Sequence, residues 1–267
     1  ISIKMKKLKF KTISIQQLAD TITPVGMYSK IRDKYANSLL LESSDYHSKE
    51  ESFTFICVEP IVTLKADNNK FKYCYKDKEI ESKKIDRNFY RIFQDYSKSI
   101  DVDCDAAIKS YNGFYGYISY NSIQYFETIK LNAKKAPSEI PDLQFSFFRF
   151  IIAINHFNDE LTLIENIEKG EESRIHEIQT LINARTYGLY KFEANGEETS
   201  NCTDEDFKNN VAKAKQHCKR GDVFQLVLSR QFQQKYSGDE FNVYRALRSI
   251  NPSPYLFYFD YENFKLM

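Results

Sequence analysis

Glycine is scarce in this chain, at 8 of 267 residues, and none of the glycines forms a GxGxxG or Walker-type loop. Such loops need closely spaced glycines so that the backbone can close around a phosphate group. A charge excess is also lacking, because 38 basic side chains face 37 acidic ones. A chain so close to neutral produces no strong overall field. The composition therefore argues against a nucleotide-binding loop and against a protein that binds nucleic acid.

Long apolar runs are missing as well. No segment approaches the roughly 20 apolar residues that a membrane-spanning helix needs, and the N-terminus lacks the apolar core of a signal peptide. Hydrophobic residues still make up 42% of the chain, which is enough for a sizeable core. We expect a globular, cytoplasmic protein that does not bind membranes.

Cysteine and histidine are few and scattered. The 5 cysteines are odd in number and form no CxxC pair, and the 4 histidines form no cluster. His217 and Cys218 are the nearest candidate pair for a metal, but neighbouring residues of one helix point in different directions. We expect reduced, mostly buried thiols and no metal site in this chain.

Alternating β-branched and aromatic residues predict strands in the first two thirds of the chain. The predicted strands cover residues 8–15, 38–42, 52–58, 61–65 and 113–120. The apolar run 143–157, followed across Asn158 and Asp159 by 160–164, predicts a hairpin. Helical spacing occurs at residues 25–35, 86–96 and 173–184. The pattern predicts an α+β fold with mainly antiparallel sheets, helices packed outside and a two-part architecture.

The clearest helix pattern follows a polar stretch. Thr203, with Asp206 three residues later, is a typical capping start, and Gly221 stands where a C-terminal glycine is expected. The polar residues 193–201 predict a linker. We therefore expect an N-terminal domain at 1–192 and a second part at 202–267.

Residues 221–230 are apolar on both faces of a strand pattern, which predicts a central strand. Gln225 interrupts this pattern and shares a face with Val223 and Val227, so we expect its amide to be buried. A buried amide needs hydrogen-bond partners. The residues alone favour a satisfied core glutamine and leave a ligand-facing role open.

Two further segments are informative only in combination. Residues 251–258 begin with two prolines that fix the backbone as a rigid turn before another strand. Residues 39–44 form an apolar strand that ends in a carboxylate and two hydroxyls. Each segment alone indicates only a strand next to a turn or loop.

Together and in this order, these segments resemble component I of anthranilate synthase, in the family of chorismate-utilizing enzymes. Residues 39–43 are similar to its leucine-glutamate-serine feedback segment, and residues 251–255 match its feedback turn in full. Residues 113–120 and 221–230 resemble its glycine-tyrosine strand and the opening of its chorismate-binding domain. Two positions depart from the family: Asn121 stands where aspartate is usual, and Leu256 where methionine is common.

The resemblance implies a lyase of tryptophan biosynthesis that adds ammonia to chorismate and eliminates pyruvate, leaving anthranilate. A partner, the glutamine amidotransferase component II, would supply the ammonia. The resemblance also implies a site for feedback inhibition by tryptophan. Its residues would be Glu42, Ser43, Asn251, Pro252, Ser253, Pro254, Tyr255 and Leu256.

Gln225 gains a second interpretation from the resemblance. Relatives that add water to chorismate carry lysine at this position, where it can serve as the general base that water needs and ammonia does not. Gln225 is therefore expected to neighbour the active site of an ammonia-using enzyme.

In the family, the strand that ends here at residues 264–267 is followed by the catalytic acid-base residues and the glutamates that bind magnesium. We therefore expect Mg²⁺ in the full-length enzyme, no bound metal in this chain, and no anthranilate from the chain alone. Two alternatives remain open: component I of aminodeoxychorismate synthase, and a tryptophan-binding regulatory module without catalytic activity.

Overall fold

The computed structural model describes residues 7–43, 52–85, 88–129, 131 and 140–267. The chain forms two compact units. The first comprises Ile1–Gly188 together with Leu247–Met267, and the second comprises Leu189–Ala246. The chain passes from the second unit back into the first within one helix, α5 (Phe241–Ile250).

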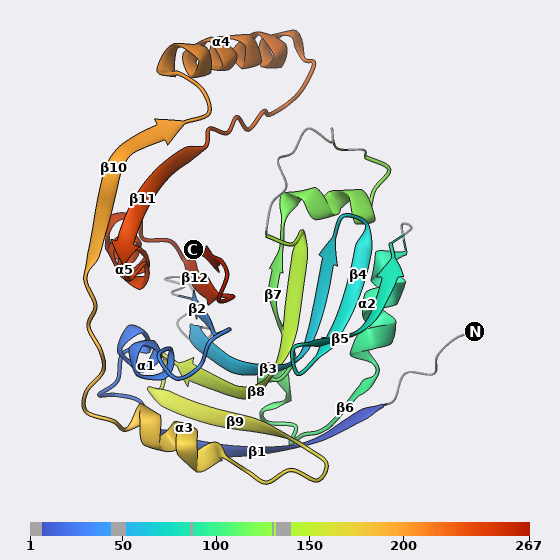
Figure 1. Cartoon of the computed structure of the whole chain (residues 1–267), viewed down its shortest axis with the longest axis vertical. Coiled ribbons are helices and arrows are strands. Elements are labelled where there is room, and N and C mark those ends of the chain that lie inside the picture. The colour runs from blue at the N-terminus through green and yellow to red at the C-terminus, as the bar shows by residue number, and fades with distance from the viewer. Residues whose placement is uncertain (1–6, 44–51, 86–87, 130, 132–139) are drawn as a thin grey trace. The chain divides into compact units, whose positions relative to one another are not determined.

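A large sheet forms the first unit, and its order is β13-β12-β2-β3-β8-β9-β1-β6, with β4 and β5 continuing from β3 and β7 pairing with β8 (Figure 1). Its strands are β1 (Leu8–Leu18), β2 (Leu39–Ser43), β3 (Phe53–Asp67), β4 (Lys70–Tyr75), β5 (Lys78–Lys84), β6 (Ile100–Asp103), β7 (Phe114–Ile118), β8 (Leu143–Asn155), β9 (Glu160–Glu168), β12 (Tyr255–Asp260) and β13 (Lys265–Leu266). In the described ranges only β1 and β6 pair in parallel. The predicted α+β fold with mainly antiparallel sheets is confirmed.

The long strand β3 connects two parts of this sheet. Its first half pairs with β2, and its second half pairs with β4. Between the halves, Glu59 has a positive φ of 60° and Pro60 lies next to a register shift against β8. Proline has no backbone N–H to donate to the ladder, so it is tolerated at such a bulge. The two halves therefore contribute to two different hydrophobic clusters.

The helices α1, α2 and α3 accompany the sheet in the first unit. α2 (Phe89–Ser97) packs Phe89, Ile92 and Tyr96 into one cluster, beside β4 and β5 in Figure 1. α1 (Pro24–Ile31) is capped by Thr23, whose hydroxyl accepts a hydrogen bond from the Gly26 N–H. Lys30 of α1 donates to the Ile182 carbonyl, at the end of α3 (Ile175–Ile182), at 2.8 Å. The described residues also include the short 3₁₀ helices η2 (Lys109–Tyr111) and η3 (Tyr120–Tyr125). In the ranges that the structure describes, no helix has both the length and the apolar character to span a bilayer.

The second unit consists of a two-stranded ribbon, one long helix and the start of α5. The strands β10 (Phe192–Ser200) and β11 (Phe232–Gly238) pair in antiparallel, and α4 (Asp204–Arg220) lies between them in sequence. The predicted start and end of α4 are confirmed. The Thr203 hydroxyl accepts a hydrogen bond from the Asp206 N–H, and Gly221 ends the helix with a positive φ of 80°.

The predicted linker 193–201 lies almost entirely in β10, and the division into domains around it stays a prediction. Two other local expectations were wrong. Residues 221–230 form no strand, and Gln225 is exposed. An apolar pattern buries a strand only if a neighbouring layer covers it, and no described strand pairs with this segment. Of the cysteines only Cys57 is buried, so the thiols are not mostly buried.

Candidate functional site

The two segments predicted to form one site lie side by side in the first unit. β12 pairs in antiparallel with β2, and the register places Tyr255 opposite Ser43 and Leu256 opposite Glu42 (Figure 1). Leu39 and Leu40 of β2 are fully buried, which fixes this strand in the interior of the sheet. The structure thus brings the carboxyl end of β2 and the start of β12 together from distant parts of the sequence.

The pleat of the sheet divides the predicted residues between two faces. Successive side chains of a strand point to opposite faces, and directly opposite residues of paired strands share a face. Glu42 and Leu256 therefore lie on one face, and Ser43 and Tyr255 lie on the other. A ligand that lies on one face of the strand pair meets the side chains of only one set.

On its face, Glu42 is held by a cation that sequence reasoning missed. Arg248, in the last turn of α5, donates from Nη2 to Glu42 Oε1 at 2.8 Å, and its Nε lies 2.8 Å from Oε2. The Glu42 side chain is only 8% exposed, so this ion pair is largely shielded from solvent on the Glu42 side. Nothing in the local sequence around Arg248 indicates this contact, because 206 positions separate the two residues. Glu42 serves here to connect β2 with α5.

A histidine lies beside this ion pair. Thr54, opposite Glu42 in the register, is hydrogen-bonded to His156 Nε2 at 2.8 Å. Burial lowers the pKa of His156 because it disfavours the charged imidazolium, and the Glu42 carboxylate offsets part of this effect. His156 is therefore a neutral hydrogen-bonding group at neutral pH.

The opposite face of the strand pair is aromatic and partly open. Tyr255 is 70% exposed and Phe257 is 41% exposed. Leu41 lies opposite Phe257 on β12 and opposite Phe55 on β3. The ring of Phe55 lies 5.9 Å from that of Tyr111. Aromatic surface of this kind packs well against a flat ligand ring. The Ser43 hydroxyl is the polar group that β2 adds to this face.

The ends of both segments are held in position. The Ser52 hydroxyl donates to the Ser43 carbonyl at 2.8 Å, which fixes the end of β2. The turn before β12 follows directly from α5, where the Asn251 N–H donates to the Leu247 carbonyl at 2.9 Å. In this turn Asn251, Pro252 and Pro254 are exposed, and Ser253 is half-buried. The turn is therefore rigid and accessible to a ligand.

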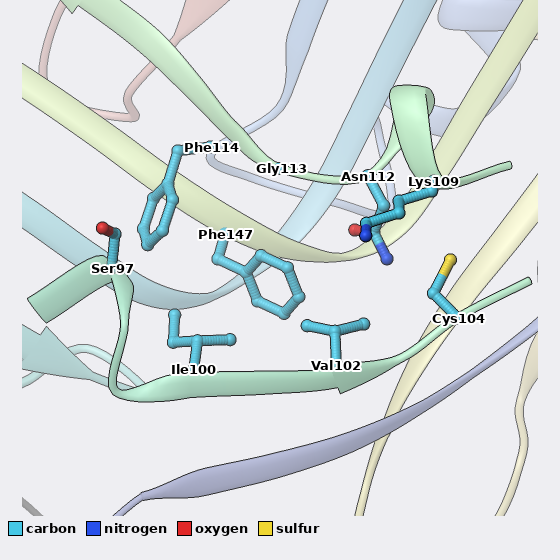
Figure 2. Close-up of a pocket in the computed structure, with 9 residues that line it drawn as sticks. All are labelled: Ser97, Ile100, Val102, Cys104, Lys109, Asn112, Gly113, Phe114 and Phe147. Carbon is cyan, nitrogen blue, oxygen red and sulfur yellow. The ribbon is translucent and has the colours of Figure 1, made fainter. Parts of the chain in front are cut away.

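A separate cavity of about 280 Å³ contains none of the predicted residues. Figure 2 shows Ile100, Val102 and Phe147 among its lining residues, together with Lys109. The Asn112 amide in its wall already donates to Thr12 and Asn166, at 3.2 and 2.7 Å. This cavity is mainly apolar. Its residues serve below as controls for the candidate site at the β2–β12 strand pair.

The described residues do not fit a magnesium ion. Mg²⁺ prefers several oxygen ligands in octahedral geometry, and nowhere in the described ranges do three or more His, Cys, Asp or Glu side chains gather to hold a metal. Gln225, the predicted neighbour of the active site, lies in the second unit with its side chain exposed.

Known proteins support the predicted resemblance. The chain is similar to anthranilate synthase component 1 of Lactococcus lactis subsp. lactis, with 29% identity over 97% of this chain and 56% of that protein. It is 25% identical to anthranilate synthase component 1 of Acetivibrio thermocellus, over 100% of this chain and 57% of that protein. The chain thus spans about half the length of these curated relatives.

A solved structure and a family model agree with these relatives. The crystal structure of anthranilate synthase component I from Streptococcus pneumoniae TIGR4 matches with a TM-score of 0.59 and 18% identity, over 93% of this chain and 55% of that one. At that identity the match shows a common fold. The model of the chorismate binding enzyme family matches residues 38–267. Because this match covers most of the sequence, the chain belongs to the chorismate binding enzyme family.

Proposed function

We propose that this chain is part of an anthranilate synthase component I and that the β2–β12 strand pair carries its feedback site for tryptophan. The whole enzyme would convert chorismate and ammonia to anthranilate and pyruvate, with ammonia supplied from glutamine by an amidotransferase partner. The relatives named anthranilate synthase component 1 support the reaction. The observation that carries the feedback site is the register that places Tyr255 opposite Ser43.

The open aromatic face suits the indole ring of tryptophan. Phe257 and Tyr255 offer ring surface, and an aromatic contact contributes about 0.5–1.5 kcal/mol beyond its buried area. The Ser43 hydroxyl and the backbone of the proline turn would bind the polar end of the amino acid. Glu42 would act indirectly, because its carboxylate is already held by Arg248.

Feedback requires that tryptophan bind one state of the enzyme better than another. The position of the site in the chain suggests how this would occur. α5 belongs to both units, since Ala246 ends the second unit and Leu247 resumes the first. The proline turn follows α5 directly and leads into β12. A ligand that fixes the turn would therefore restrict the end of the helix shared by both units.

Gln225 would distinguish this enzyme from relatives that add water. An amide cannot accept the proton that water loses during attack, whereas ammonia needs no such base. We therefore keep Gln225 as a proposed neighbour of the active site. Product analysis of the whole enzyme separates anthranilate from aminodeoxychorismate as the product.

Thermal unfolding with increasing tryptophan tests the feedback site. Binding to the folded state raises Tm with ligand concentration, and a ligand at about 100 times its Kd adds about 2.7 kcal/mol. We expect Tyr255→Ala and Ser43→Ala to reduce the rise. Lys109→Ala, in the cavity of Figure 2, is the matched control and should leave the rise unchanged. If only Lys109→Ala abolished the rise of Tm with tryptophan, this result would contradict a tryptophan site at the β2–β12 strand pair.

A fluorescence assay with chorismate, ammonia and magnesium tests whether this chain alone forms anthranilate. The described residues contain no cluster of metal ligands. We therefore expect no anthranilate from this chain alone. Measurable turnover would show that the chemistry resides in residues to which we assign no catalytic role.

A further inference from the structure

The cavity of Figure 2 has apolar walls that the described chain covers only in part. Ile100 and Val102 come from β6, Phe114 comes from β7 and Phe147 comes from β8. Phe147 is buried, whereas the other three side chains are only half-buried. These three pack against the hydrophobic cluster to which Phe147 belongs. A ligand in the cavity would remove more of their apolar surface from water, which favours binding.

Regular structure holds these walls in position. Phe114 lies directly opposite Phe147 in the register of β7 and β8, and their ring centres are 6.0 Å apart. Asn112, which precedes β7, is fixed by its two donated hydrogen bonds and by a third that its Oδ1 accepts from the Asn166 amide at 2.9 Å. The Asn112 amide therefore serves as a rigid part of the wall. Such support is what a preorganised binding site requires.

Lys109 gives the cavity its charge. It is the one charged side chain among the lining residues, and none of the described residues that line the cavity is acidic. Asp101 and Asp103 alternate with Ile100 and Val102 along β6, so their side chains point to the opposite face of that strand. Within the described ranges the Lys109 ammonium group has no ion-pair partner. The cavity therefore favours a ligand with a negative charge.

The volume of the cavity, about 280 Å³, sets the size of the ligand. An apolar cavity of about 150 Å³ is enough for benzene, so this one has room for an aromatic ring and a short chain. Phe114 and Phe147 suit such a ring, because aromatic rings pack well against one another in tilted or offset arrangements. At Gly113, in the same wall, a Cβ would have no heavy atom within 4 Å, so the space beside it is open.

We propose that this cavity binds a small aryl carboxylate. The ring would pack between the apolar side chains beside Phe114 and Phe147, and the carboxylate would pair with Lys109. An amino acid such as tryptophan suits the cavity less well, because its ammonium group would meet no acidic side chain there. None of the residues proposed to bind tryptophan lines this cavity, so the two proposals can fail independently.

Three probes with the same phenyl ring test the charge preference: 3-phenylpropionate, 3-phenylpropionamide and 3-phenylpropylamine. Their chains have nearly equal lengths and end in a carboxylate, a neutral amide and an ammonium group. Titrations followed by NMR on the intact chain should show that the carboxylate binds about three- to fivefold more tightly than the amide, as an exposed ion pair predicts. The amine should bind most weakly. The preference for the carboxylate should disappear in 1 M salt, where the Debye length falls to about 3 Å.

Cys104 reports where the probe binds, because it lines the cavity. A saturating concentration of 3-phenylpropionate should slow the alkylation of Cys104 by iodoacetamide. Cys218 is exposed in the second unit, so its alkylation is the control within the same chain and should proceed at an unchanged rate. Mass spectrometry of the digested protein measures both rates.

Variants separate the charge from the cavity. Lys109→Met should abolish the preference for the carboxylate over the amide, whereas Lys70→Met, at an exposed lysine of β4 outside the cavity, is the matched control and should retain it. Gly113→Leu should weaken binding of both probes, because its side chain would occupy the open space. The proposal is overturned if the three probes bind equally, if Lys109→Met keeps the carboxylate preference, or if the bound probe does not slow alkylation of Cys104. It is also overturned if Gly113→Leu binds both probes normally in a chain that still unfolds cooperatively.

Discussion

The ion pair between Glu42 and Arg248 gives the clearest prediction about the candidate site. Removing one partner of a buried pair costs about 3–5 kcal/mol, because the other charge is left buried and unpaired. Exposed pairs contribute about 0–1 kcal/mol. The Glu42 side chain is 8% exposed and that of Arg248 is 36% exposed, so this pair is intermediate. We expect Arg248→Met to lower the free energy of unfolding by about 2 kcal/mol.

Urea denaturation followed by circular dichroism measures this loss, and thermal unfolding should show a decrease in Tm of roughly 4–8 °C. The double variant Glu42→Gln with Arg248→Met should recover much of the stability, since it also removes the buried carboxylate that has lost its cation. Lys7→Met is the matched control, because the exposed pair Lys7–Asp101 is 3.5 Å long with side chains 61% and 49% exposed. We expect that control to change the free energy of unfolding by less than about 1 kcal/mol.

Equal effects of Arg248→Met and Lys7→Met would refute this reasoning. They would show that the Glu42 carboxylate does not depend on Arg248. Glu42 would then be available to a ligand, and the assignment of an indirect role to it would be wrong.

Three further predictions concern the surrounding structure. Arg149→Met should cost about 3–5 kcal/mol in urea denaturation, because it leaves the fully buried Glu165 carboxylate without its cation; a loss below about 1 kcal/mol would contradict this. Gly116→Ala should detach β7 from β8 and increase hydrogen exchange of β7, since its Cβ would lie 1.9 Å from the Gln144 carbonyl oxygen; unchanged exchange would contradict the close approach. Burial lowers the pKa of His156 in the folded state, so the folded state binds fewer protons and loses stability as the pH falls below the usual value of about 6.5. His156→Gln should remove this part of the pH dependence of Tm, and an unchanged profile would count against it.

Much of the first unit was predictable because its strands show local alternation. The hairpin of β8 and β9 is signalled by apolar runs on both sides of Asn158 and Asp159, and Asp159 adopts a left-handed turn conformation with φ 52°. Helix α4 was predictable because both of its ends carry capping residues. These signals depend on neighbours in sequence and need no knowledge of tertiary contacts.

The second unit shows where such reasoning fails. A polar segment such as residues 193–201 resembles a linker, but a two-stranded ribbon with exposed faces tolerates the same composition. An apolar segment such as 221–230 resembles a central strand, yet burial depends on a neighbouring layer. Phe224 has no such layer and is fully exposed. Sequence patterns report which side chains can be buried, whereas tertiary structure decides which of them are.

The candidate site was predictable only in part. That the ends of β2 and β12 meet followed from the combination of motifs, and the register bears it out. The contact of Glu42 with Arg248 and the pair of Thr54 with His156 join residues far apart in sequence, so no local pattern indicates them.

The most direct test of the central claim uses the absence of tryptophan from this sequence, which contains 0 such residues. Every indole NMR signal in a mixture with tryptophan must therefore come from the ligand. We predict intermolecular NOEs from the indole ring protons to Tyr255 and Phe257, and from the α-proton side of the ligand to Ser43. Saturable binding with NOEs only to Val102 and Phe147, in the cavity of Figure 2, would contradict a tryptophan site at the β2–β12 strand pair.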